Sequence, residues 1–504
     1  MQAFRGPYRR VDLLIELAIA LVIVVLVLLD SSRAVPRADV TLRVLTTPSG
    51  RRIPAGFLGL SMEYTSVERY AGQDPAAINP VFVHLIENLT AGQATVIRIG
   101  GDTTDRTWWP VGGITPPPGI KFSLDSRWLN VVRALVRGLR ARLILGINLE
   151  ANSATIAQTE ARALVGGLGA AAVRALEVGN EPELYGRFAW YRAAGGSRVT
   201  GRPLDYDYPA FSSDFTNVAS VLPSLPLAGP AWGNYSWTGD LGPFLGSEPR
   251  LGLATLHRYP LQRCFVKPTS ARYPTIDNLL APVASTGLAE RFATFAAIAH
   301  FHHVPFRLDE LNTVSCGAVR AVSQSFAAAL WSVDALFALL RAGVDGVNVH
   351  TFPEAGYNLF RFSRPGERWQ GAVSPQYYGL LLFARATPPG SRLAAVVGAR
   401  PLALRAWATR GPGGSVRVVL INDDPHRGHV VALRIAGSHG PASILRLEGP
   451  GLGAQGGVTW GREGFGAETQ TGTLKPHPEA ADPAGGKYTV RIPAASAALV
   501  TLSL

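Results

Sequence analysis

A-L-E-V-G-N-E-P (residues 175–182) and F-R-L-D-E-L-N (residues 306–312) are each typical of a buried β-strand that ends in polar residues. Each segment places a glutamate near its carboxyl end, Glu181 in the first and Glu310 in the second. Six further segments share this short apolar pattern, at residues 56–64, 95–101, 142–149, 225–232, 253–260 and 344–352. Eight such strands with helical stretches between them predict parallel pairing and closure into a (β/α)8 barrel.

The sequence changes character after about residue 390, where short alternating strands and turns predict an antiparallel β-sandwich. We therefore expect a (β/α)8 TIM barrel over residues 55–385 and a β-sandwich domain over residues 386–504. The isolated strand pattern at Val40 to Val44 has no obvious barrel partner. We expect this N-terminal segment, residues 36–54, to cross over and complete the sandwich.

Residues 1–35 have the pattern of a targeting segment. Arginines at positions 5, 9 and 10 precede an apolar run over residues 13–29, which is just long enough to span a bilayer. Ser32-Arg33-Ala34 resembles a signal-peptide cleavage site, so a removed signal peptide and a retained transmembrane anchor both remain open. In either case we expect the folded part to be secreted or extracytoplasmic.

The composition is that of a globular protein, with 47% hydrophobic and 17% charged residues among 504. The formal net charge of +12 is carried almost entirely by arginines scattered along the chain. A basic groove for an acidic polymer is one interpretation. We favour the other, a solvated basic surface, and expect no nucleic-acid partner.

Cys264 and Cys316 are the only two cysteines, and each lies just beyond a predicted strand, the sixth and the seventh. Because neighbouring strands of a barrel have neighbouring loops, and because an even pair in an exported protein favours a disulfide, we expect these residues to join two loops. No cluster of histidines and cysteines has the spacing of a zinc site. We expect no metal and no cofactor.

Glu181 and Glu310 fall on predicted strands four and seven, at the end of the barrel where catalytic residues sit. Two carboxylates facing each other there suit retaining glycoside hydrolysis, with one as acid/base and the other as nucleophile. Asn180 is suited to bind a sugar hydroxyl, and Arg98 on strand two is expected to hold Glu310 ionised or to pair with Glu177. His257 is expected in a supporting position.

Two other acids compete for these roles. Strand alternation predicts that Asp309 faces away from Glu310. Glu183 follows Pro182 and is expected to lie outside the strand. We therefore expect neither to be catalytic.

Several segments together resemble glycoside hydrolase family 79, the family of heparanases and β-glucuronidases: G-L-S-M-E-Y, V-I-R-I-G-G-D-T-T-D, E-V-G-N-E-P, L-H-R-Y-P, R-L-D-E-L-N and A-G-Y-N-L. The resemblance runs from about residue 40 to the end of the chain. It implies Glu181 as acid/base, Glu310 as nucleophile and a carbohydrate substrate. It also implies a sugar-binding set made of Asn180, Glu63, Asp102, Tyr259 and Tyr357.

One departure bears on the sugar. Glucuronate-binding members carry Tyr-Gly five and six residues after the nucleophile, where this chain has Ser315 and Cys316, followed by Gly317. Ser315, the Gly317 amide and Tyr357 are expected to form the carboxylate pocket instead. Two alternatives stay open: a relative that acts on a neutral sugar such as a xyloside or arabinoside, and a catalytically inert surface glycan-binding protein.

Overall fold

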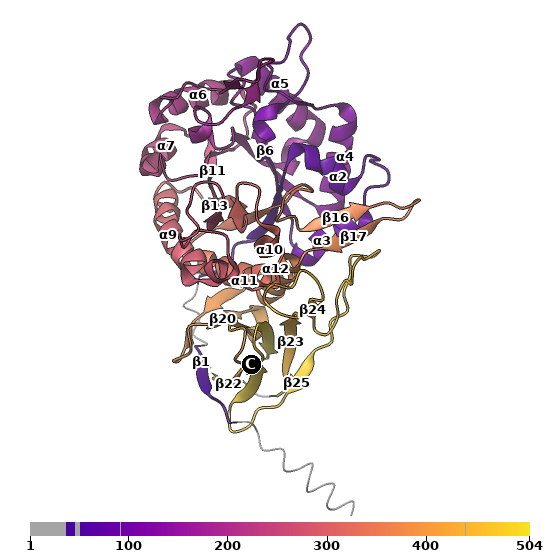
Figure 1. The fold of residues 1–504 in the computed structure, drawn as a ribbon, viewed down its shortest axis with the longest axis vertical. Coiled ribbons are helices and arrows are strands. Elements are labelled where there is room, and N and C mark those ends of the chain that lie inside the picture. The colour runs from indigo at the N-terminus through magenta and orange to yellow at the C-terminus, as the bar shows by residue number, and fades with distance from the viewer. Residues whose placement is uncertain (1–36, 46–50, 91, 439, 504) are drawn as a thin grey trace, which may run out of the picture.

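The structure is a computed structural model that describes residues 37–45, 51–90, 92–438 and 440–503. Figure 1 shows a barrel ringed by helices stacked on a smaller β domain. The predicted anchor at residues 13–29 lies outside the described residues. Within the described part of the chain, no helix is long and apolar enough to cross a membrane.

Eight parallel strands close the barrel in the order β10-β11-β13-β15-β2-β3-β6-β7, and β7 pairs with β10. This confirms the predicted fold class. Each strand falls on one of the eight predicted segments: β2 (Leu58–Met62), β3 (Val96–Ile99), β6 (Arg142–Ile147), β7 (Val173–Val178), β10 (Leu227–Trp232), β11 (Leu251–Arg258), β13 (Phe306–Leu311) and β15 (Gly346–His350).

Helices cover the outside of the barrel (Figure 1). Several begin at a side-chain cap: Asp125, Ser153 and Asp207 accept hydrogen bonds from amides in the first turns of α4, α5 and α6. The main helices are α3 (Pro80–Thr90), α4 (Ser126–Leu139), α5 (Ala154–Leu168), α6 (Tyr208–Val221), α9 (Thr286–Phe301), α11 (Phe326–Arg341) and α12 (Pro375–Ala386).

The second domain is a β-sandwich of two sheets. One sheet has the order β19-β1-β22-β26, and the other has the order β18-β20-β21-β27-β23-β24 with β25 added on β23. The strands are β1 (Val40–Val44), β18 (Arg392–Ala394), β19 (Val396–Val397), β20 (Leu404–Arg410), β21 (Val416–Asn422), β22 (His429–Ile435), β23 (Ala442–Glu448), β24 (Thr459–Trp460), β25 (Glu479–Ala481), β26 (Tyr488–Ile492) and β27 (Ser496–Leu502).

The N-terminal strand joins the sandwich, as predicted. β1 lies between β19 and β22, and it runs parallel to β22 although the sandwich was expected to be antiparallel. β1 precedes the barrel in the chain and β22 follows it, so no hairpin joins the two strands. Parallel pairing is possible because the whole barrel forms the connection between them.

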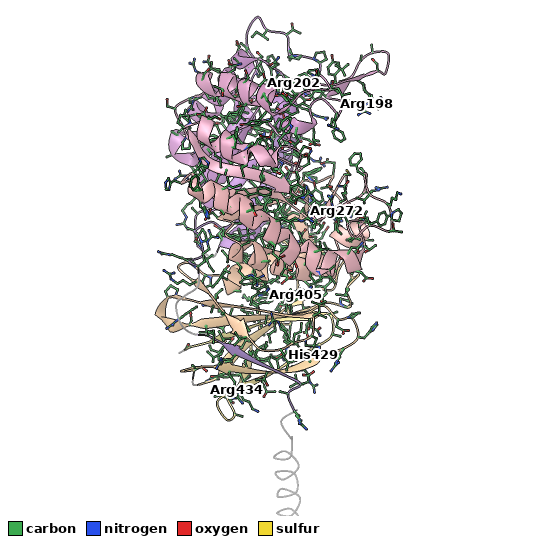
Figure 2. The ribbon with its side chains drawn as sticks, turned by 90° about the vertical axis from the view of Figure 1, so that its left-hand side faces the viewer. Arg198, Arg202, Arg272, Arg405, His429 and Arg434 are labelled. Carbon is green, nitrogen blue, oxygen red and sulfur yellow. The ribbon has the colours of Figure 1, made fainter. Side chains whose placement is uncertain are left out.

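The barrel and the sandwich meet along α11, which is apolar all round and buried along almost its whole length. Trp407 of β20 stacks on Phe337 of α11, with ring centroids 5.5 Å apart. The indole of Trp407 donates to Asp334 at 2.8 Å, and Arg405 forms an ion pair with the same carboxylate at 2.9 Å. Figure 2 shows Arg405 at this junction.

The position of β1 generates a stability prediction. Leu42 is fully buried in the sandwich core, whereas Thr41 on the same strand is exposed. We expect Leu42→Ala to lower the free energy of unfolding by about 2–5 kcal/mol. The matched control Thr41→Ala should change it by less than about 0.5 kcal/mol. Denaturant unfolding measures both, and equal effects would contradict the assignment of β1 to the core.

Candidate active site

A register shift in β13 directs two consecutive acids into the barrel. Leu308 pairs with Leu256, but the next pair along β11 is His257 with Glu310, so Asp309 is the extra residue. Asp309 lies 3.5 Å from Arg98 Nε and from His257 Nε2, and Glu310 lies 2.8 Å from Arg98. The expectation that Asp309 faces away from Glu310 is therefore wrong, because the irregularity interrupts strand alternation.

Glu181 is placed by the turn that follows β7. Gly179 and Glu181 both have positive φ, at 80° and 50°. The backbone amide of Glu181 donates to the carbonyl of Ala231 at 3.0 Å, which ties the turn to the end of β10. Gly233 leaves room for the carboxylate, since a methyl group at that position would overlap with Glu181 Oε1. The side chain is 22% exposed and so faces an open cleft.

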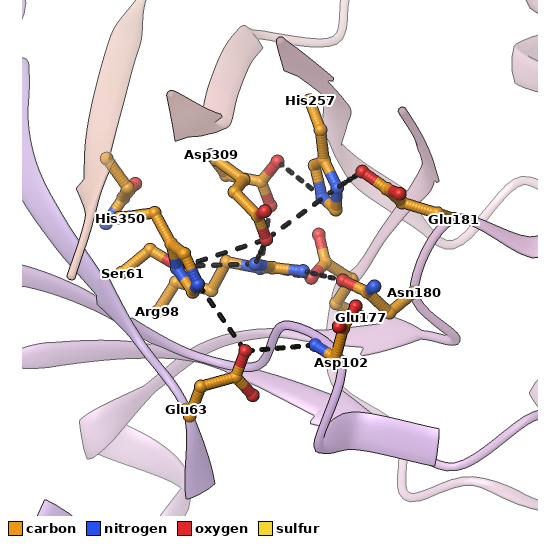
Figure 3. Close-up of polar contacts among 12 residues, drawn as sticks. Ser61, Glu63, Arg98, Asp102, Glu177, Asn180, Glu181, His257, Asp309 and His350 are labelled. Atoms are coloured by element: carbon orange, nitrogen blue, oxygen red, sulfur yellow. Dashed lines mark hydrogen bonds and ion pairs between the residues drawn. The ribbon is translucent and has the colours of Figure 1, made fainter. Parts of the chain in front are cut away.

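Arg98 is the hub of the site (Figure 3) and is fully buried. It donates to Glu177 at 2.6 Å, to Glu310 at 2.8 Å and to the side-chain oxygen of Asn180 at 2.9 Å. The two roles expected for Arg98, pairing with Glu177 and holding Glu310, are therefore met together. One guanidinium can do this because its donors form a fixed planar fork.

The surroundings of Glu310 favour its ionised form. Burial alone would raise its pKa, but the positive charges of His350 and Arg98 outweigh burial, and Tyr259 donates to its Oε1 at 2.9 Å. The net effect holds the pKa of Glu310 well below its ordinary value. Burial lowers the pKa of His257 to about 4, so near neutral pH this ring is uncharged. Arg98 and His350 therefore supply the positive charge that stabilises the ionised carboxylate of Glu310.

The surroundings of Glu181 have the opposite effect. Burial and repulsion from Glu310 raise the pKa of Glu181 to about 8. His257 Nδ1 lies 3.2 Å from Glu181 Oε1 and 3.8 Å from Glu310 Oε2. A carboxylate oxygen of each glutamate and a ring nitrogen of His257 all lie within 4.8 Å of one another. The site therefore holds one protonated and one ionised carboxyl side by side at neutral pH.

Beneath this pair, Asp309 and Glu177 share a buried position. Burial, repulsion from Glu177 and a hydrogen bond to Glu177 raise the pKa of Asp309 well above its ordinary value. Asp309 therefore carries a proton, while Arg98 keeps Glu177 ionised. A cation at Glu177, His257 and Asp309 would lie against the charge of Arg98, so this set of side chains favours proton sharing over metal binding.

The predicted sugar-binding side chains line the space above the two glutamates. Tyr259 and Tyr357 lie with their hydroxyl oxygens 3.1 Å apart. Asn180 accepts from Arg98, which orients its amide and leaves Nδ2 without a hydrogen-bond partner among the described residues. The tyrosine hydroxyls and the Asn180 amide therefore lie beside Glu310 and Arg98.

Glu63 and Asp102 are close to each other but differ in role. The carboxylate of Glu63 accepts from the amides of Asp102 and Thr103 and so holds the loop after β3. Desolvation by the surrounding protein, together with repulsion from Glu63, Glu181 and Glu310, raises the pKa of Asp102 to about 7. Binding of ring hydroxyls by Glu63 and Asp102 stays a prediction.

Ser315 and Gly317 are not in contact with the two glutamates. The Ser315 hydroxyl lies 3.5 Å from the carbonyl of Leu261, on the neighbouring loop. Gly317 lies beside Gly356, which precedes Tyr357. Cys264 and Cys316 are free thiols in the structure, so the predicted disulfide is not formed there, although the two side chains are hydrogen-bonded to each other.

Sequence reasoning missed several residues of the site. His350 is the last residue of β15 and lies within the eighth predicted segment; its Nδ1 lies 2.8 Å from the Ser61 hydroxyl and 4.0 Å from Glu310. Asp105 is buried and accepts from the amides of Leu149 and Asn180. His350 could have been found as a polar residue at the end of a predicted strand. The prediction considered such residues only where they were acids or close to the acids in sequence.

Glu183 was expected to lie outside the strand and is buried beside the cleft. Its carboxylate accepts from the backbone amides of Gly233 and Asn234 at 2.7 Å and 2.8 Å. Glu183 thus fixes the segment whose Gly233 makes room for Glu181.

No protein-family model and no curated protein matches this chain. Solved structures do resemble it. A 4-O-α-L-rhamnosyl-β-D-glucuronidase from Fusarium oxysporum 12S has a TM-score of 0.68 at 19% identity, covering 92% of this chain and 100% of that one. The GH51 arabinofuranosidase from Xanthomonas axonopodis pv. citri has a TM-score of 0.67 at 15% identity, covering 93% and 100%.

A family 44 xyloglucanase from Paenibacillus polymyxa is also similar, with a TM-score of 0.60 at 10% identity, covering 93% of this chain and 100% of that one. At these identities the likeness concerns the fold. The chain therefore has the barrel-and-sandwich architecture found among glycoside hydrolases.

The electrostatics of the site predict a measurable coupling. Glu310→Gln removes the charge that repels Glu181, so the pKa of Glu181 should fall from about 8 toward its ordinary value. Burial remains in the variant, so the pKa should stay above that of an exposed glutamate. Carbon-13 NMR of the side-chain carboxyls measures the titration. The exposed Glu367→Gln is the control, and an equal shift in both variants would refute the coupling.

Proposed function

We propose that this protein hydrolyses glycosidic bonds with retention of anomeric configuration, using Glu181 as acid/base and Glu310 as nucleophile. The observation that carries the proposal is the pair itself: two carboxyls close together at the ends of β7 and β13, in opposite protonation states. Retaining enzymes hold these groups about 5–5.5 Å apart, whereas inverting enzymes leave about 6.5–9.5 Å for a water molecule.

In the first step Glu310 attacks the anomeric carbon while Glu181 donates its proton to the leaving oxygen. Arg98 and Tyr259 keep Glu310 anionic until attack, and its charge is consumed as the glycosyl-enzyme ester forms. The Nδ2 group of Asn180 is free to donate to the sugar 2-hydroxyl, a contact that strengthens as the transition state develops.

In the second step Glu181, now ionised, takes a proton from the water that attacks the ester. Loss of the negative charge on Glu310 during the ester stage removes the repulsion that raised the pKa of Glu181. The same residue can therefore serve as acid in one step and as base in the next.

For the sugar we propose a β-linked glucuronate or a related uronate. The hydroxyls of Tyr259 and Tyr357 lie 3.1 Å apart, and Tyr259 contacts Glu310. Hydroxyl donors of this kind bind a carboxylate without adding a full charge. The sequence resemblance to glycoside hydrolase family 79 and the structural likeness to a glucuronidase support the same choice.

A neutral sugar, such as an arabinoside or xyloside, is the second candidate. The Ser315 hydroxyl lies 3.5 Å from the Leu261 carbonyl, which engages one of the donors expected in the carboxylate pocket. The likeness to an arabinofuranosidase points the same way. An inert glycan-binding protein is less well supported, because both glutamates and their network are intact.

We also propose that the folded part is exported, on the basis of the targeting pattern in residues 1–35. Secretion and anchoring through residues 13–29 are both compatible with this proposal.

Variants of the two glutamates test the mechanism. Glu181→Ala should lower hydrolysis by about 10²–10⁴-fold, with a smaller loss for aryl leaving groups that need little protonation. Added azide should restore its rate and yield a β-glycosyl azide. Glu310→Gln should lose at least as much activity and gain nothing from azide. Product NMR with the wild type should first show the β-anomer, and an initial α-anomer would overturn retention.

A panel of aryl glycosides tests the sugar. We expect the glucuronide to have the highest kcat/KM, and Tyr357→Phe to lower that value by about tenfold or more because a hydrogen bond to a charged group is lost. The same variant should change hydrolysis of a neutral xyloside only slightly. A wild-type preference for xyloside or arabinoside would favour the second candidate.

A further inference from the structure

The loops that follow the sixth and seventh barrel strands are joined by a small ladder. β12 (Leu261–Gln262) pairs in parallel with β14 (Val314–Ser315). Cys264 comes two residues after this ladder on one side, and Cys316 comes directly after it on the other. Adjacent strands lie about 4.8 Å apart, which is within the Cα separations that disulfides span. Continued by one residue, the register places Cys316 opposite Arg263, so Cys264 and Cys316 lie diagonally across neighbouring chain segments.

The backbone around Cys316 is unusual. Cys316, Gly317 and Ala318 have φ values of 63°, 81° and 61°, so three consecutive residues lie in the left-handed region. For a residue other than glycine this conformation costs about 1–2 kcal/mol, and it persists only where the surroundings impose it. Ala318 is buried against Gly356: a methyl group added to Gly356 would lie 2.9 Å from the Cβ of Ala318. This turn carries the Cys316 thiol, which interacts with Cys264.

Phe265 directly follows Cys264 in the chain. The ring of Phe265 is 68% exposed and meets the ring of Phe188, 44% exposed, edge to face at a centroid distance of 6.0 Å. Phe188 belongs to the loop that follows β7 and Glu181. The two phenylalanines therefore form an aromatic wall between the loop that carries Cys264 and the loop that follows Glu181, the proposed acid/base for the leaving group. Large apolar side chains exposed in contact with each other indicate a binding surface.

We propose that Cys264 and Cys316 are a modification site: they form a disulfide that fixes this aromatic wall over the leaving-group side of the cleft. The position of the disulfide rests on the structure alone, whereas the role of the wall rests on the proposed function.

The chemistry requires a disulfide oxidant such as glutathione disulfide. Burial and the neighbouring Cys264 raise the pKa of Cys316 to about 11, so Cys316 keeps its proton and Cys264 attacks first. The Cys264 thiolate displaces one glutathione and forms a mixed disulfide. Cys316, on losing its proton, then displaces the second glutathione. Two protein thiols are oxidised and one glutathione disulfide is reduced to two glutathiones, which take up the two protons.

Thiol state is measured without any substrate, on the full chain incubated with glutathione disulfide, alkylated and analysed by intact mass and peptide mapping. We expect the wild type to lose both free thiols without an adduct and to yield one cross-linked peptide pair. Cys264→Ser should retain one thiol or gain one glutathione, and so should Cys316→Ser. Circular dichroism verifies that both variants are folded. Two free thiols or two glutathione adducts in the oxidised wild type would overturn the disulfide.

The wall is tested by comparing oxidised and reduced wild type on the preferred sugar with two leaving groups, a bulky aromatic one and fluoride. We expect oxidation to lower KM several-fold for the bulky substrate and to leave the fluoride unchanged. The double variant Cys264→Ser/Cys316→Ser should not respond to oxidation. An equal response of both substrates would overturn the role of the wall, whereas loss of all hydrolysis would refute the proposed function and leave the disulfide result standing.

Discussion

A single buried guanidinium, that of Arg98, is the constraint on which the site depends. It has no access to solvent and lies against Glu177, Asp309 and Glu310, so removing it would leave several buried acids without a counter-charge. Loss of one partner from a buried ion pair costs about 3–5 kcal/mol. Arg98 contacts Glu310 and the acids beneath it but does not contact Glu181. This one cation therefore favours the ionised form of Glu310, while Glu181 keeps its proton.

The barrel was predictable because its strands are short, apolar and separated by amphipathic or buried helices, and each of the eight predicted segments overlaps an observed strand. The sandwich was predictable from its alternating pattern, and β1 from its lack of a barrel partner. The parallel pairing of β1 with β22 was not predictable, since strand direction depends on the path of the chain and not on local residue pattern.

The close approach of Glu181, Glu310, Asn180 and Arg98 was predictable because position along a strand decided it. The site was not predictable where the backbone departs from regular geometry. The register shift in β13 turns Asp309 inward, and no feature of R-L-D-E-L marks the shift. His350 was missed for a different reason: its role depends on Ser61 and Glu63, which are distant in sequence and adjacent only after the barrel has closed.

The place of β1 also affects how the protein is made. Asp39, just before this strand, bonds His429, and the two residues are 390 positions apart in the chain. During synthesis β1 emerges from the ribosome before the whole barrel, while its partner strands emerge near the end. The sandwich can therefore complete only after nearly the entire chain is available, and until then an apolar strand with unpaired edges has to be kept from other chains.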